Sequence, residues 1–129
     1  MINTSAFDYI NILGKTADAA WIRNDVIANN IANATTPGYK REEVEFEAEL
    51  EKALRNSRYT SMDDKVGNLK INRLSPRTYR DSAGFSYRLD GNNVDIETEN
   101  VALASNQMKY NGLIDCLTQE FKNLQMVMK

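Results

Sequence analysis

The chain has 129 residues, and its 16 basic and 18 acidic side chains leave a net charge of −2. This balance predicts no general attraction to nucleic acid or to an anionic membrane, and the length suits one domain at most. The sequence contains no histidine, the commonest general base and metal ligand, and no glycine-rich phosphate loop. We therefore expect a protein that is not an enzyme and that uses no cofactor and no metal ion.

Targeting signals and cysteines add little. No apolar run reaches the roughly 18 residues of a membrane span, so no direct membrane insertion is expected. The first eight residues lack a basic segment followed by an apolar one, so no cleaved secretory signal is expected. The single cysteine, Cys116, excludes an intramolecular disulfide and is expected to pack within a helix.

The first predicted element is a long helix over residues 5–34. Ser5 is a candidate N-cap, and Asp8 adds negative charge to the first turn. Apolar residues recur in steps of three and four, as in a coiled coil, with Asn24 the one polar interruption. Phe7 and Trp21 lie off this stripe, so the helix has a second apolar side and needs more than one neighbour. The stripe contains Ala6, Ile10, Leu13, Ala17, Ala20, Ile27, Ile31 and Ala34.

A turn is predicted where this helix ends. Thr36 precedes a proline and is disfavoured in helical backbone. Pro37 and Gly38 suit the two central positions of a type II turn, in which the glycine takes a positive φ. Asparagine is a poor helix former, yet three stand close together before the turn: Asn29, Asn30 and Asn33. Their amides either bond carbonyls at the helix end or a neighbouring helix, or they form a polar, frayed terminus.

Residues 41–90 are predicted to form a polar middle segment that is partly extended or flexible. Within it, residues 59–90 are expected to become partly ordered only on assembly. The stretch 41–49 is rich in acids and reads as a solvated face, and residues 41–58 are predicted to be partly helical. The apolar face of that helix contains Phe46, Leu50, Ala53 and Leu54.

Further along, turns are predicted at residues 63–64, 82–84 and 90–91, and one strand at residues 85–89. A second long helix is predicted to begin at Ile96, with Asp95 as its N-cap and Glu97 and Glu99 in its first turn.

The second helix carries another coiled-coil stripe, interrupted by Asn100 and Gln107. The stripe contains Ile96, Leu103, Tyr110, Ile114, Leu117, Phe121, Leu124 and Met128. Additional apolar residues widen it: Val101, Ala104, Met108 and Val127.

The predicted fold is mainly α. Long N- and C-terminal helices, in segments 1–40 and 91–129, pack as a coiled-coil-like core beside the middle segment 41–90. A hairpin of two helices buries one seam and leaves the additional apolar side chains exposed, and such a surface binds partners. We therefore predict assembly with other copies or related subunits. The predicted interface contains Ile10, Leu13, Ala17, Ala20, Ile27, Ile31, Leu103, Tyr110, Ile114, Leu117, Phe121 and Leu124. The alternative function is a cytoplasmic helical adaptor or regulator that dimerises through the C-terminal heptad helix.

Two runs resemble a known family. Residues 28–40 resemble the N-terminal signature of bacterial flagellar rod and hook proteins, which reads approximately A-N-N-[IL]-A-N-x-x-T-P-G-[YF]-K. Its positions here are Asn29, Asn30, Ile31, Asn33, Thr36, Pro37, Gly38 and Tyr39. Residues 90–95 and 106–110 resemble the C-terminal third of the short proximal rod subunits, through Asn92, Asn93 and Val94.

The resemblance implies a structural subunit of the flagellar basal body. Such a subunit is exported without cleavage through the flagellar type III apparatus and polymerises in the periplasm into the proximal rod, which transmits torque and surrounds the export channel. The implied partners are other copies, neighbouring rod subunits, the adaptor at the base of the rod and the export apparatus. The signature residues are expected to fix helix ends and contacts between subunits.

Overall fold

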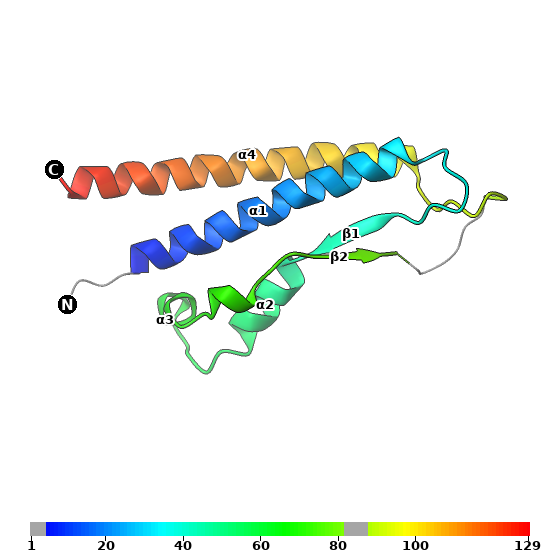
Figure 1. Ribbon diagram of the computed structural model, residues 1–129. Coiled ribbons are helices and arrows are strands. Elements are labelled where there is room, and N and C mark those ends of the chain that lie inside the picture. Colours follow the sequence, from blue (N-terminus) through cyan, green and yellow to red (C-terminus); the bar gives the residue numbers. More distant parts are fainter. Residues whose placement is uncertain (1–4, 82–87) are drawn as a thin grey trace.

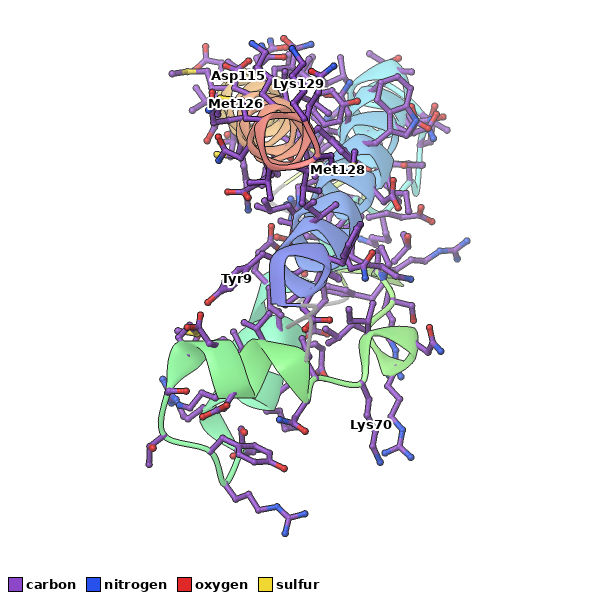
Figure 2. All side chains as sticks on the ribbon, turned by 90° about the vertical axis from the view of Figure 1, so that its left-hand side faces the viewer. Tyr9, Lys70, Asp115, Met126, Met128 and Lys129 are labelled. Carbon is purple, nitrogen blue, oxygen red and sulfur yellow. The ribbon has the colours of Figure 1, made fainter. Side chains whose placement is uncertain are left out.

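The computed structural model describes residues 5–81 and 88–129. Helix α1 (Ser5–Ala32) lies between helix α4 (Ile96–Val127) and a smaller middle lobe, so the chain has three layers (Figures 1 and 2). The middle lobe contains β1 (Glu42–Glu45), α2 (Glu47–Arg55), α3 (Met62–Gly67), the 3-10 turn η1 (Ile71–Arg73) and β2 (Arg77–Arg80). The prediction of a mainly α fold with long terminal helices packed together is confirmed.

The two long helices run antiparallel and separate gradually. They are closest where α1 ends and α4 begins, and they splay apart toward the other end, where α1 begins and α4 ends (Figure 1). No helix of residues 5–81 and 88–129 is long and apolar enough to cross a membrane.

Helix α1 is buried on two faces. The predicted stripe forms the face toward α4, where Ile10, Ala17, Ala20 and Ile27 are buried. Ala34 is buried just beyond the helix, which ends at Ala32 rather than at residue 34. The side chains of Ser5 and Ala6, and with them the predicted cap, lie outside the described part.

The second face of α1 differs from the prediction. Ala19 and Val26 are buried, and Ala19 packs against Phe46 and Leu74 of the middle lobe. Phe7 and Trp21, which we expected on this side, are each 56% exposed. The small side chain of Ala19 lets the middle lobe approach the helix closely, and hydrophobicity gives alanine too little weight to mark this face in the sequence.

Helix α4 begins as predicted, because the Asp95 side chain accepts a hydrogen bond from the backbone N–H of Glu97. Of the two heptad positions predicted to face inward, only one does so. Leu103, Tyr110, Leu117 and Leu124 are half-buried, as expected for one of the two heptad positions.

The second heptad position is displaced by one residue from the prediction. The inward residues are Glu99 and Asn106, which are buried, and Leu113 and Glu120, which are half-buried. The residues predicted at this position are exposed: Asn100, Gln107, Ile114, Phe121 and Met128. Ile96, at the first position, is exposed as well. Cys116 is also exposed, so its predicted packing is wrong.

The middle lobe is more ordered than the sequence indicated. β1 pairs antiparallel with β2, in the register that sets Glu42 opposite Arg80 and Glu45 opposite Arg77. The acids of residues 41–49 are all partly or fully exposed, as the sequence indicated, while Val44 and Phe46 between them are buried. The predicted apolar face of α2 is confirmed, since Leu50 and Ala53 pack against the cluster around Phe46.

Two smaller predictions also fail. Residues 63–64 form no turn but lie in α3, which is capped by the side chain of Ser61. Residues 88 and 89, the end of the strand predicted over 85–89, form no strand, whereas Arg77–Arg80 does. The turn predicted at residues 82–84 and the first part of that predicted strand lie outside the described residues, while Leu89 is exposed in the turn before Gly91.

Candidate functional site

The two signature runs meet where α1 ends and α4 begins. We call this region the junction and define it as residues 29–43 and 88–99 together with Asp81. It lies at the end of the molecule opposite the start of α1 and the end of α4 (Figure 1). Its two segments are distant in sequence and include the end of α1 and the start of α4. Contacts between them therefore fix the position of α4 relative to α1.

The predicted turn is present. Gly38 has a φ of 72°, and the Tyr39 N–H donates to the Thr36 carbonyl oxygen at 3.3 Å, as a type II turn requires. The Gly38 N–H donates to the Asp90 carbonyl oxygen at 2.7 Å and so ties the turn to the second signature run. Gly91 has a similar φ of 76°, and its backbone lies against that of Gly38.

Asn92, in the segment before α4, caps the end of α1. Its amide nitrogen donates to the carbonyl oxygens of Asn33, Ala34 and Thr36 at 2.8, 3.1 and 2.9 Å. Its amide oxygen accepts from the Val94 N–H at 2.8 Å. The last carbonyls of a helix have no partner within the helix, and here a completely buried side chain supplies one.

Asn30 joins α1 to β1, because its side-chain amide pairs with the backbone of Glu42 as a neighbouring β-strand would. Its amide oxygen accepts from the Glu42 N–H at 2.9 Å, and its amide nitrogen donates to the Glu42 carbonyl oxygen at 2.8 Å. The Tyr39 hydroxyl donates to the same amide oxygen at 3.0 Å. Burial, and then the carboxylates of Glu42 and Glu99, raise the pKa of the Tyr39 hydroxyl, which stays protonated as this hydrogen bond requires.

A buried ion pair fastens the start of α4. Glu99 is 1% exposed and accepts from the Arg41 guanidinium at 2.8 Å, while Asp81 accepts from the same guanidinium at 3.0 Å. Burial acts to lower the pKa of Arg41, but the hydrogen bonds to Glu99 and Asp81 outweigh it and hold the pKa above its ordinary value. Asn93 completes the region, since its amide oxygen accepts from the Arg41 N–H at 2.7 Å.

The remaining signature residues have lesser roles. Asn33 bonds back to the Asn29 carbonyl oxygen at 2.8 Å within the helix end, and the Asn29 side chain is exposed. Val94 is buried, and Ile31 is half-buried. The two alternatives predicted for these asparagines therefore apply to different residues. The Asn30 side chain bonds to other segments, whereas Asn29 and Asn33 form a polar helix end.

The predicted interface residues fall into two groups. Those on α1 lie against α4 within the chain, where Ile10, Ala17, Ala20 and Ile27 are buried and Leu13 and Ile31 are half-buried. On α4, Leu103, Tyr110, Leu117 and Leu124 are half-buried, and only Ile114 and Phe121 are exposed.

A second ionic contact, which the sequence did not indicate, joins all three layers. Glu47 at the start of α2 accepts from Arg23 of α1 at 2.5 and 2.7 Å and also binds Lys109 of α4. The Arg23 hydrogen bond, opposed by burial and assisted by Lys109, lowers the pKa of Glu47 to about 2. The only signal available in the sequence was an acid in the first turn of a helix.

These features describe a rigid joint. The polar groups of the junction satisfy one another, and the described residues contain no cluster of acids and cysteine suited to a metal ion. The arrangement suits a building block that carries two long helices at a fixed angle.

Comparison with known proteins agrees with that class. Residues 10–40 match the model of the flagella basal body rod protein family. The chain is 38% identical to the flagellar basal body rod protein FlgB of Borrelia hermsii, over 93% of this chain and 95% of that protein. It is 32% identical to FlgB of Bacillus subtilis over 92% of each chain, and 32% identical to FlgB of Escherichia coli over 83% of each.

The two helices and their junction thus define a structural protein, of the kind that builds an axial assembly. The chain belongs to the flagellar basal body rod proteins. Within that family it is similar to the proteins named FlgB. It is accordingly a structural subunit of the basal body rod.

Proposed function

We propose that this chain polymerises into the proximal part of the rod, with other copies of itself, neighbouring rod subunits and the adaptor at the base of the rod as its partners. It reaches that place through the flagellar type III export apparatus without cleavage. The terminal helices form the inner wall around the export channel, and the rod that they build transmits torque.

Apolar side chains exposed on more than one side of α4 carry this proposal. Val101 is 71% exposed, Met108 76% and Phe121 56%, and all three belong to one helix. Ile114, Met126 and Val127 extend the exposed apolar surface along α4. Burying one large apolar side chain completely contributes roughly 1.5–3 kcal/mol, so several such residues supply a substantial free energy of association.

The splay of the helices adds a place for a neighbouring helix. An open hollow of about 610 Å³ is lined by the N-terminal half of α1, the C-terminal half of α4 and η1 of the middle lobe. Ile10, Leu117 and Phe121 line it. A helix inserted there would cover apolar side chains of both long helices at once.

The test is the location of the protein in the cell. An epitope-tagged chain that restores motility to a deletion strain should copurify with detergent-extracted basal bodies at the proximal end of the rod. Recovery of the tagged chain only from the cytoplasm, as a stable dimer, would overturn the proposal and favour the helical adaptor instead.

A further inference from the structure

Charge is distributed unevenly along this chain. Residues 52–80 carry eight of the sixteen basic side chains and only two of the eighteen acids, so this part of the middle lobe has a net charge of +6. The remaining residues hold eight basic and sixteen acidic side chains and have a net charge of −8. Such a division favours attraction between different parts of different molecules.

The basic residues surround a hollow in the middle lobe. An open hollow of about 580 Å³ is lined by Arg58, Lys65, Lys70 and Arg73, and by no acid of the described chain. The Arg58 guanidinium lies 6.0 Å from the centre of the Tyr59 ring, which also lines the hollow. Figure 2 shows Lys70 pointing away from α1 into solvent. We call this feature the basic hollow.

The cations of the basic hollow differ from those in the rest of the fold. Arg23, Arg41 and Lys109 each bind a carboxylate of another element. By contrast, none of the four cations lining the hollow makes an ion pair with a residue of the described ranges 5–81 and 88–129. Like charges held near one another repel, so a ligand with several carboxylates gains free energy there.

The complementary surface is the exposed flank of α1. Asp18 and Asp25 are exposed and make no ion pair with a described residue. They stand seven residues apart on one side of the helix, about 10 Å along its axis. Between them Trp21 and Ile22 are 56% and 37% exposed, so the flank combines two carboxylates with apolar surface.

The outer side of α4 fits less well. There the exposed acid Asp115 is followed by Lys122 on the same helix and by Lys129 just beyond its end, and both lysines are also exposed. Figure 2 shows Asp115 and Lys129 at the side of α4 that faces away from the middle lobe. Those lysines would repel the cations of the basic hollow, so the α1 flank is the better partner.

We propose that the basic hollow of one copy binds the Asp18–Asp25 flank of α1 on a neighbouring copy. The inference rests on the proposed function and names the contact by which the middle lobe takes part in it. Two different surfaces meet in this contact, so one copy of a bound pair keeps a free flank and the other keeps a free hollow. Such heterologous contacts extend into open helical filaments when the rotation does not close a ring.

Charge reversal on each side separately, and then on both, tests this contact. Lys70→Glu with Arg73→Glu reverses the hollow, and Asp18→Lys with Asp25→Lys reverses the flank. All four positions are exposed, so the fold should be retained, which circular dichroism checks. Each pair of substitutions should reduce incorporation into basal bodies at least tenfold, and the chain carrying all four should recover most of it.

A mixing experiment with purified chains gives an independent readout. Neither doubly substituted chain should self-associate, while an equimolar mixture should, because each presents surfaces complementary to those of the other. Lys122→Glu with Lys129→Glu is the charge-matched control on α4 and should leave association with the hollow unchanged.

The inference is overturned if the chain with all four substitutions stays as poorly incorporated as the separate pairs, because the hollow then binds another acidic ligand. Normal incorporation of both pairs overturns it as well. These results differ from failure of the proposed function, in which the unsubstituted chain itself would be missing from basal bodies. In that case association in the mixture would still support the contact, and its absence would refute it.

Discussion

Asparagine side chains link the segments of the junction, because one amide can donate a hydrogen bond to one backbone group and accept one from another. Asn30 and Asn92 are both completely buried, and each replaces hydrogen bonds that a continuous helix or sheet would have provided. Neither aspartate nor glutamine reproduces this: the first lacks the amide donors, and the second is one methylene too long for the same positions.

Replacing Asn92 by alanine should destabilise the isolated chain. The substitution leaves carbonyls of Asn33, Ala34 and Thr36 without this donor, and a buried polar group without a partner costs about 1–3 kcal/mol. Urea denaturation measures the change in the free energy of unfolding. Asn29→Ala is the control, since the Asn29 side chain is exposed; equal stability of the two variants would contradict the capping role of Asn92.

The second residue-scale prediction concerns Gly38. A side chain there meets no atom within 4 Å, so only the φ of 72° opposes substitution. Gly38→Val should therefore destabilise the chain by about 1–2 kcal/mol through backbone strain, and Gly38→Asn by less, because asparagine tolerates a positive φ. Thermal denaturation of both variants compares the two costs, and a valine variant as stable as the asparagine variant would exclude the type II turn.

At the scale of elements, the middle lobe is attached to the helix pair by a small apolar cluster and by the contacts of Glu47. The cluster joins Ala19 of α1 to Phe46 and Leu74. Glu47 adds ionic bonds to both long helices. Because this carboxylate is partly exposed, with 38% of its side-chain surface accessible, solvent screens its ion pairs and their contribution is modest.

The attachment should depend on pH. The pKa of Glu47 is about 2 in the folded chain, below its ordinary value of 4.5. A lowered folded-state pKa stabilises the fold above the ordinary pKa, and that stabilisation is lost as the pH falls from about 4.5 to about 2.

Unfolding measured by urea at several pH values should thus show a smaller decline over this range for Glu47→Gln than for the unsubstituted chain. Glu51→Gln is the control, because Glu51 pairs only with Arg55 on the exposed side of α2. A Glu47→Gln chain whose stability declines as steeply as that of the original would show that the three-way contact contributes nothing.

In the molecule as a whole, the separation of the helices leaves many large apolar side chains of α4 exposed. The junction holds α1 and α4 together at one end, but α4 has no described neighbour except α1 along most of its length (Figure 1). In the isolated chain the junction is therefore well packed, while the separated ends of α1 and α4 are partly uncovered. Neighbouring subunits would cover them on assembly.

Replacing Phe121 by aspartate separates folding from assembly. Phe121 is 56% exposed in the single chain, so the substitution should leave the fold and export unchanged. In a packed rod an unpaired buried charge costs several kcal/mol, so the variant should be secreted but absent from rods, and the cells should lack flagella.

Immunoblots of the exported fraction and of purified basal bodies distinguish the two steps. Lys122→Asp, one residue away and exposed, should assemble far better. Rods of normal composition built from Phe121→Asp chains would place this face of α4 outside the assembly.

The sequence by itself determined the features that depend on short stretches of chain. These include the extent of both long helices, the Asp95 cap, the turn at Pro37 and Gly38, and the family signature. Each follows from backbone preferences or from the spacing of neighbouring residues, so no distant partner needs to be known. For the same reason the apolar face of α2 was predictable from its helical spacing.

The face of α4 that points inward depends on contacts between residues that are distant in the sequence. The heptad pattern allows two adjacent choices, and hydrophobicity favours Ile114 and Phe121 over Leu113 and Glu120. The fold takes the other choice because Glu99 finds Arg41 and Asn30, and Asn106 finds the Ala20 carbonyl oxygen. A polar side chain is buried only where such partners exist, and here they lie 58 to 86 positions away along the chain.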